Sequence, residues 1–344
     1  MSELVDVLPQ VRIDPLNGTR VIVAGGRAER PGSLLPVQPL PEIDPGDDPF
    51  AEGNESCTPP ELFADRPGGG DADTPGWRVR CIPNAFPSLV GGESREALAD
   101  PLGAVRGMPE LLTSDHAHGA HEVIVNHPGP VSVLAALEPA ELSNCLRVWA
   151  LRVSVHAKNA AFVHVSTNEG STAGATIAHT HTQLFGLPFV PPLVARERER
   201  MRAYREHTQG RDLVQDLLAE EVRNGERLVA IDDHAALISP FAAASPYRLT
   251  IIPRSPEPRF EDSLDRGAGM LFTALKALAD RFGVSPPLNL WVRTAPRDAE
   301  HFCWRIEIAP RVSQPSGFEL GTGSSTNSTS PELAAAELRE VIAT

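Results

Sequence analysis

The pentapeptide HTHTQ at residues 179–183 follows an apolar segment, residues 161–165, and a loop of small residues. The apolar segment predicts a buried strand, and small residues in the loop allow backbone N–H groups to approach a ligand closely. If the pentapeptide is extended, His179, His181 and Gln183 lie on one face, because side chains alternate along a strand. The chain must therefore place a polar, imidazole-bearing face next to a strand of its core.

The residue types on this face suit phosphorus chemistry. An imidazole is a good nucleophile towards an activated phosphate when its second nitrogen is held by a hydrogen-bond acceptor, and a neighbouring amide can donate to a phosphate oxygen. The alternative is a polar strand whose histidines only complete hydrogen bonds. The small-residue loop, Gln183 and the apolar flanks favour the first interpretation.

Length and charge narrow the function further. The chain has 344 residues, enough for one large domain or two moderate ones, and its hydrophobic content of 41% is that of a globular protein. A net charge of −14 argues against nonspecific binding to nucleic acid or to an anionic membrane. A small phosphorylated substrate would need a local basic pocket.

The four cysteines are scattered and form no C-x-x-C pair. This spacing predicts a reducing compartment, without a disulfide framework and without a zinc knuckle. The N-terminus lacks the basic and apolar regions of a signal peptide, and no run approaches eighteen apolar residues. We therefore expect a cytoplasmic protein.

Two apolar runs separated by Asn17-Gly18 predict a hairpin within residues 11–32. Arg27 and Arg30 follow the second run. Their guanidinium groups either serve a phosphorylated ligand or lie in a solvated loop, and this segment alone supports both interpretations.

The rest of the chain alternates between sheet and helix patterns. The expected elements, in order, are an irregular connection at 33–76, strands in 77–89 and 119–128, a helix at 138–158, a charged helical stretch at 196–223 interrupted near Gln209-Gly210, a strand within 238–258, a helix at 270–281 and strands at 289–292 and 303–308.

The second half repeats the order of the first, and residues 303–308 stand where the histidine run stood. This recurrence predicts an internal duplication. We expect an α+β fold of two tandem units, each a mainly antiparallel sheet with packed helices. Residues 1–195 would form the unit with the catalytic run, and residues 196–344 the unit without catalytic histidines.

Several short motifs occur in a fixed order along most of the chain. They read R-x-D-P-L-x-G and R-A-x-R-P near the N-terminus, P-N-x-F-P from residue 83, G-x-H-E-V-I from residue 119, N-x-G and H-x-H-x-Q around the histidines, and W-x-I-E-I-x-P-R followed by G-F-E-L-G-T-G near the C-terminus. Together they resemble the galactose-1-phosphate uridylyltransferase family, within the histidine-triad superfold.

The resemblance implies a ping-pong nucleotidyl transfer in which His181 attacks the α-phosphorus of a nucleoside diphosphate sugar. A sugar 1-phosphate then collects the nucleotide. Gln183 would bind the transferring phosphoryl oxygens, and His179 would complete the catalytic run. The residues implied at the nucleotide are Arg27, Arg30, Asn84, Phe86, Asn168, Gly174 and Thr176, and those implied at the sugar are Arg305, Phe318 and Glu319. For Glu319, capping of a turn is the alternative.

The chain departs from the family pattern in the histidine run and at the metal positions. Family members usually read H-P-H-G-Q, so Thr180 and Thr182 replace a proline and a glycine that shape the backbone. Many members carry zinc on a C-P-F-C tetrapeptide, where this chain reads D-P-F-A at residues 48–51, and Pro130 stands at a further ligand position.

Arg293 and Arg305 stand where a second metal site of some members has histidines. One carboxylate and one imidazole do not close a tetrahedral zinc site. We therefore expect neither a metal nor another cofactor, with His179 held by hydrogen bonds and the site stabilised in another way.

Three functions are open to such a chain. The first is transfer between a nucleoside diphosphate sugar and a sugar 1-phosphate, with a homodimer as the expected assembly. The second keeps the covalent histidine but passes the nucleotide to phosphate or water, as in a phosphorylase or hydrolase of nucleotide sugars or dinucleoside polyphosphates. The third is a noncatalytic nucleotide-binding protein, against which the intact H-x-H-x-Q run argues.

Overall fold

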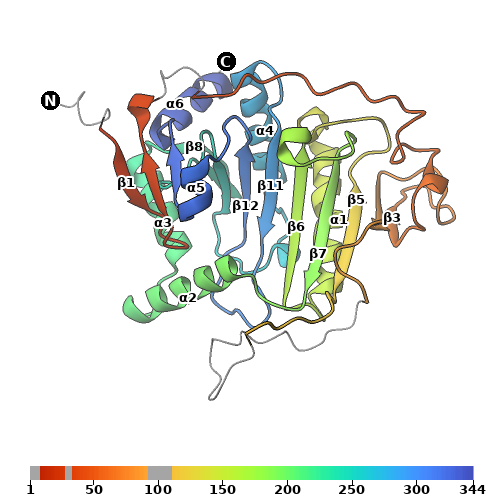
Figure 1. The fold of residues 1–344 in the computed structure, drawn as a ribbon, viewed down its shortest axis with the longest axis horizontal. Coiled ribbons are helices and arrows are strands. Elements are labelled where there is room, and N and C mark those ends of the chain that lie inside the picture. The colour runs from red at the N-terminus through yellow and green to blue at the C-terminus, as the bar shows by residue number, and fades with distance from the viewer. Residues whose placement is uncertain (1–7, 28–32, 92–110, 344) are drawn as a thin grey trace.

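The computed structural model describes residues 8–27, 33–91 and 111–343 and has an α+β architecture (Figure 1). Its strands are β1 (Gln10–Ile13), β2 (Arg20–Val23), β3 (Phe63–Asp65), β4 (Val79–Pro83), β5 (Ala120–Val125), β6 (Phe162–Glu169), β7 (His181–Leu187), β8 (Leu228–Ile231), β9 (Ala235–Ile238), β10 (Leu249–Pro253), β11 (Leu288–Arg293), β12 (Arg305–Pro310) and β13 (Ser325–Asn327). Its α-helices are α1 (Pro139–His156), α2 (Pro192–His207), α3 (Leu213–Asn224), α4 (Ala268–Phe282), α5 (Gly317–Thr322) and α6 (Pro331–Ile342).

Ten strands form one sheet in the order β3-β4-β5-β7-β6-β11-β12-β10-β9-β8, and every neighbouring pair is antiparallel. The two halves of this sheet have the same strand order. Read from the outer edge towards the middle, one half is β3, β4, β5, β7, β6 and the other is β8, β9, β10, β12, β11, so the last two strands of each half are exchanged relative to the chain order. The halves meet where β6 pairs with β11. The predicted α+β fold with an internal repeat is confirmed. The boundary at residue 195 stays a prediction.

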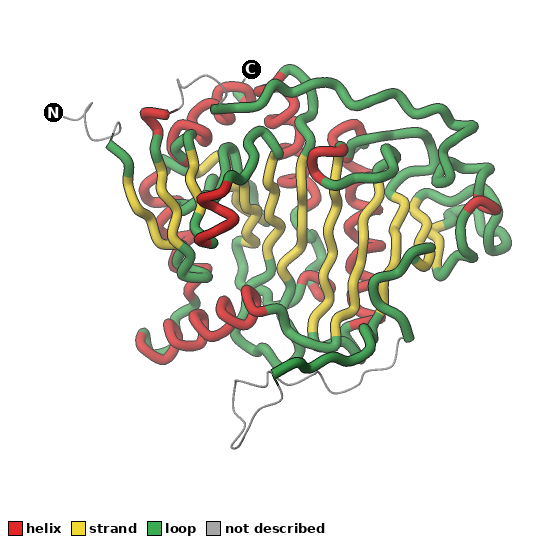
Figure 2. The backbone as a smooth tube through the Cα atoms, viewed as in Figure 1, coloured by secondary structure: helices red, strands yellow, loops and turns green. Residues whose placement is uncertain are grey.

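Helices cover the two faces of the large sheet differently (Figure 2). On one face, α1, α4 and α6 bury apolar side chains against both halves of the sheet in a single core that includes Trp149, Leu278 and Leu338. On the other face, α2 and α3 pack with side chains of β9 and β10. The small sheet β1-β2-β13 packs Val21 and Val23 against Ala242. The second face of the first half carries His181, and part of it packs in a separate apolar cluster of Phe50, Trp77, Ile82, Val123 and Val125.

The helix expected at residues 138–158 is α1. Glu138 and Glu141 form a reciprocal capping box, and Pro139 occupies the first turn, where its missing N–H costs nothing. Buried residues at helical spacing, among them Leu142 and Trp149, lie against the sheet. The packing of α1 therefore supports these strands on the face opposite to the one that carries the histidines.

Other expectations were met with small shifts of the element ends. The hairpin is β1 and β2, turned by Gly18 with φ +75°, and the break in the charged helical stretch falls at Gln209 and Gly210 between α2 and α3. The connection expected to be irregular contains the short strand β3. No helix in the described residues is long and apolar enough to cross a membrane.

Candidate active site

His181 begins β7, between β5 and β6. Its Nδ1 lies 2.7 Å from the backbone oxygen of His179, and because a carbonyl can only accept, Nδ1 carries the proton. Burial lowers the pKa of His181, although this hydrogen bond opposes the shift. The ring is therefore neutral at pH 7, and Nε2 presents a lone pair, which is the state a nucleophile needs.

Gln183 lies two residues further along the same face of β7, and its Oε1 is 3.0 Å from His121 Nε2. The N–H of Ser88 donates to His121 Nδ1, so Nε2 holds the ring proton and donates to Gln183. Asn84 Nδ2 lies 3.0 Å from the same Nε2. His121 thus fixes the amide of Gln183 with its oxygen turned inward, which leaves the amide N–H₂ able to donate to a phosphoryl oxygen.

Thr180 and Thr182, which stand where the family pattern has proline and glycine, are buried in a hydrogen-bond network. This network constrains the backbone in place of those two residues. Asn126 Nδ2 donates to both hydroxyls at 3.2 and 3.1 Å, and Thr182 Oγ1 lies 2.7 Å from Thr167 Oγ1. Trp149 of α1 donates to Asn126 Oδ1. Paired buried hydroxyls hold the strand in one position, so the altered run keeps a defined geometry.

His179 precedes β7, so the condition of an extended run holds for His181 and Gln183 but not for His179. The chain bends at His179, and the N–H of Thr180 donates to Val131. The His179 ring is buried, with Nδ1 2.6 Å from Asp48 Oδ2 and Nε2 2.7 Å from the His127 oxygen. His179 contacts the His181 ring through its backbone oxygen, which accepts the hydrogen bond from His181 Nδ1.

The loop after β6 supplies a backbone turn beside the histidines. Gly170 has φ +81°, and a Cβ there would lie 2.9 Å from Pro287 Cβ, so only glycine fits. Gly174 is left-handed at φ +91°. Asn289 Nδ2 of β11 donates to Asn168 Oδ1 at 2.7 Å and to the Ala173 oxygen at 2.8 Å, and so ties the loop to the second half of the sheet.

The residues implied at the nucleotide differ in their exposure to solvent. Asn168 is half-buried, whereas Thr176 and Gly174 are exposed. Phe86 is 90% exposed, and its N–H donates to Asn84 Oδ1, which makes a tight turn with a free aromatic ring beside the polar face. A solvent-facing ring next to a donor cluster is suited to stacking on a base.

The other implied residues do not join this cluster within one chain. Arg27, Phe318 and Glu319 line a separate open cavity of about 640 Å³ beside the small sheet and α5. In Figure 1, β12, β11 and β6 lie between α5 and β7. Glu319 forms the capping box of α5 with Ser316, and this hydrogen bonding lowers the pKa of Glu319 to about 2. Arg30 lies outside the described residues.

Arg305, expected at the sugar, is 1% exposed in an ion-pair cluster. Its Nη2 lies 2.7 Å from Glu197 of α2 and its Nε 3.0 Å from Glu307. Burial alone would lower the pKa of Arg305, but the two carboxylates raise it above the ordinary value. The guanidinium joins α2 to β12, and it also lines a cavity of about 230 Å³.

The sequence did not assign roles to His121 or Phe50. The Phe50 ring lies edge-on to His181, with centroids 5.3 Å apart. His121 stands in the G-x-H-E-V-I motif, whose alternation places it on the face of Gln183 once β5 is paired with β7. That pairing is the signal by which His121 could have been found.

A buried carboxyl, Glu169, lies at the end of β6 beside this site. Burial raises its pKa to about 8, against hydrogen bonds from Leu134 and Thr180 that lower it. The folded chain therefore keeps a proton that the unfolded chain releases near pH 4.5, and stability falls as pH rises towards 8. We expect Glu169→Gln to have the wild-type melting temperature at pH 5 and a higher one at pH 8.

Differential scanning fluorimetry across pH 5 to 8 measures this difference. Glu199→Gln, at an exposed position of α2, is the control and should show the pH dependence of the wild type. An equal effect of Glu169→Gln at pH 5 and pH 8 would contradict a neutral carboxyl in the fold.

The chain is similar to known proteins along most of its length. The family model for galactose-1-phosphate uridyl transferase, N-terminal domain, matches residues 72–191, which include the whole histidine run. The chain is 29% identical to ADP-glucose phosphorylase from Arabidopsis thaliana over 97% of this chain and 93% of that one. It is 27% identical to a probable galactose-1-phosphate uridylyltransferase from Drosophila melanogaster over 97% and 95%.

Solved structures show the same fold. The crystal structure of the Arabidopsis thaliana ADP-glucose phosphorylase with bound ADP-glucose superposes with a TM-score of 0.77, at 26% identity, over 97% of this chain and 99% of that one. A uridylyltransferase structure superposes with a TM-score of 0.70 over 98% and 99%. The chain is thus similar, in sequence and in fold, to members of the galactose-1-phosphate uridylyltransferase family.

Proposed function

We propose that the chain transfers a nucleoside monophosphate from a nucleoside diphosphate sugar to a phosphate-bearing acceptor through a covalent nucleotidyl-His181. One observation carries this proposal: His181 Nδ1 is committed to the His179 carbonyl, so that Nε2 holds the free lone pair. Relatives in the family are named as enzymes of nucleotide sugars and sugar phosphates, which supports the substrate class.

In the first half-reaction, His181 Nε2 attacks the α-phosphorus. The N–P bond forms, the bond to the bridging oxygen breaks, and a sugar 1-phosphate leaves with that oxygen and its electron pair. Gln183, oriented by His121, donates to the α-phosphoryl oxygens as charge moves through the transition state. The hydrogen bond from His181 Nδ1 to His179 stabilises the positive charge that the imidazole gains.

In the second half-reaction, a phosphate oxygen of the acceptor attacks the same phosphorus. The new P–O bond forms, the N–P bond breaks, and His181 recovers its lone pair. Asn84, Phe86, Asn168, Gly174 and Thr176 are proposed to hold the nucleotide. Arg27, Phe318 and Glu319 are proposed to serve the acceptor side, and a homodimer is the proposed assembly.

The compound that accepts the nucleotide determines the class of the reaction. A sugar 1-phosphate makes the chain a hexose-1-phosphate nucleotidyltransferase. The similarity to ADP-glucose phosphorylase along nearly the whole chain favours a second candidate, in which inorganic phosphate takes the nucleotide and an adenine nucleotide is the donor. Both acceptors attack through a phosphate oxygen, so the same site serves either reaction.

Product analysis with parallel acceptors tests the proposal. Purified protein is incubated with ADP-glucose or UDP-glucose and with phosphate, galactose 1-phosphate or no acceptor. We expect acceptor-dependent turnover with at least one phosphate-bearing acceptor and only slow release of nucleotide in its absence. Equal turnover without acceptor would make the chain a hydrolase. Ligand binding without turnover on a broad panel of nucleotide sugars would favour the noncatalytic alternative.

A further inference from the structure

The segment before β3 reaches across to the start of β7 through one buried pair, Asp48 and His179. Their side chains are 1% and 0% exposed, and Asp48 Oδ2 lies 2.6 Å from His179 Nδ1. The ring's other nitrogen, Nε2, lies 2.7 Å from the His127 oxygen. Because that oxygen can only accept, Nε2 carries a proton, and the second proton of the pair lies between Nδ1 and the carboxylate.

This arrangement does not fit the zinc that the family resemblance implies. A metal needs a lone pair from the imidazole, but both nitrogens of His179 are engaged in hydrogen bonds with protein oxygens. Ala51 and Pro130 stand where the pattern would have ligands, and neither side chain has a donor atom. Within the described residues, no three His, Cys, Asp or Glu side chains gather as a metal-binding group.

The same carboxylate organises its own loop. Asp48 Oδ1 accepts from the N–H of Phe50 at 3.0 Å, and the backbone oxygen of Asp48 accepts from Asn54 Nδ2 at 2.8 Å. The Phe50 ring meets His179 and His181 edge-on, with centroids 6.1 and 5.3 Å away. One side chain therefore ties the loop, the aromatic contact and the bend before β7 together.

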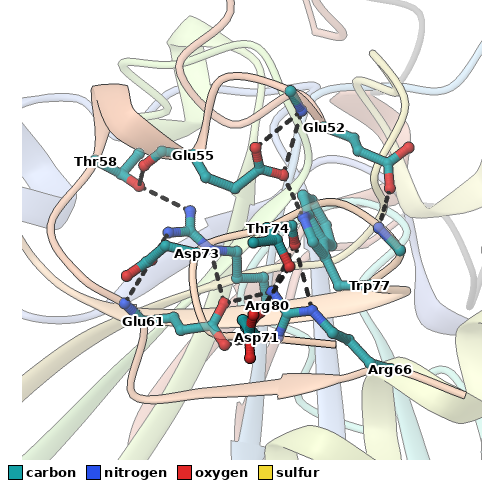
Figure 3. A network of polar contacts seen from close by, with 12 residues as sticks. Glu52, Glu55, Thr58, Glu61, Arg66, Asp71, Asp73, Thr74, Trp77 and Arg80 are labelled. Carbon is teal, nitrogen blue, oxygen red and sulfur yellow. Dashed lines mark hydrogen bonds and ion pairs between the residues drawn. The ribbon is translucent and has the colours of Figure 1, made fainter. Parts of the chain in front are cut away.

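The loop is held rigidly enough to position a side chain. Glu55 accepts from Trp77 Nε1 at 2.7 Å, and Arg80, 1% exposed on β4, contacts Glu61, Asp73 and Thr58 (Figure 3). Buried networks in which the charges are paired fix one arrangement of the chain. These contacts therefore hold the loop that carries Asp48 in one arrangement.

We propose that Asp48 is a positioning residue for the nucleophile: its carboxylate holds the His179 ring in place of a metal ion, and the His179 carbonyl then fixes the tautomer and orientation of His181. This inference rests on the proposed function for its kinetic consequence. Its structural consequence, the protonated state of His181 Nδ1, can be measured without turnover.

The test compares Asp48→Ala, Asp48→Asn and Asp47→Asn. An asparagine can still hydrogen-bond to the His179 ring, whereas alanine cannot. We expect Asp48→Ala to lower kcat about 10- to 100-fold with little change in KM, as for loss of a group that orients a catalytic ligand, and Asp48→Asn to recover most of it. Asp47→Asn alters the exposed carboxylate of the preceding residue, which does not contact the His179 ring, so it should keep wild-type kcat.

A readout independent of activity separates this inference from the proposed function. Long-range ¹H–¹⁵N spectra of protein labelled with ¹⁵N-histidine, assigned with His181→Asn, should show His181 protonated at Nδ1 in the wild type and in Asp48→Asn. A mixture of tautomers is expected in Asp48→Ala. If the wild type had no turnover but this pattern held, the proposed function would fail and the positioning role would stand.

Metal analysis of the wild-type protein completes the test. We expect less than a tenth of a zinc ion per chain and no loss of folding in the presence of a chelator. One tightly bound zinc per chain, or an unchanged His181 tautomer in Asp48→Ala, would overturn the inference.

Discussion

Replacing the proposed nucleophile, His181→Asn, is expected to lower turnover at least about a thousandfold, because the covalent route has no substitute for Nε2. Asparagine keeps a polar side chain of similar volume at the start of β7, so the fold should be retained. Steady-state assays with nucleotide sugar and phosphate-bearing acceptors measure the loss.

The control for this prediction is ligand binding. A nucleotide that binds the native state raises the melting temperature by mass action, and His181→Asn should keep that shift while losing turnover. Thr208→Asn, at the C-terminal end of α2 and away from β7, should keep both. Residual turnover above about a tenth of the wild type in His181→Asn would show that another group carries the nucleotide.

The largest expected effect on stability is that of Arg305→Met. The guanidinium is 1% exposed and lies between Glu197 and Glu307, so its loss leaves two buried carboxylates with too little positive charge to neutralise them. Removing one partner of a buried ion pair costs about 3–5 kcal/mol. We expect the melting temperature to fall by at least about 5 °C, measured by scanning calorimetry.

Two variants identify the cause of that loss. Arg202→Met on α2 removes an arginine whose side chain is 71% exposed, and it should change stability little. Adding Glu197→Leu to Arg305→Met removes a carboxylate that had lost its partner and should recover part of the loss. A double variant less stable than Arg305→Met alone would show that packing, and not uncompensated charge, sets the cost.

The sequence predicted the nucleophilic strand and its neighbours because periodicity and short motifs are local. The alternation at residues 179–183 placed His181 and Gln183 on one face, as in β7. The expected helix at residues 138–158 has its cap and its buried stripe in adjacent turns, and α1 matches it. The internal repeat followed from the order of such local elements.

Long-range pairs could not be predicted in this way. Asp48 and His179 are separated by 131 positions. The sequence indicated that a carboxylate replaces a thiolate there and that hydrogen bonds hold His179, but not that this carboxylate makes one of them. Arg305 was assigned to the sugar because its positive charge would suit a phosphorylated acceptor, whereas the fold buries it against Glu197. Sequence patterns indicate which face a side chain takes and not which distant residue faces it.

The covalent intermediate is the central claim, and intact-protein mass spectrometry tests it most directly. Protein mixed with a nucleotide sugar in the absence of acceptor should gain the mass of one nucleotidyl group per chain, and peptide mapping should place that group on His181. The adduct should disappear when phosphate or a sugar 1-phosphate is added, and it should not form in His181→Asn. A protein that turns over its nucleotide sugar without any such adduct, or that carries the adduct on another residue, would contradict the account.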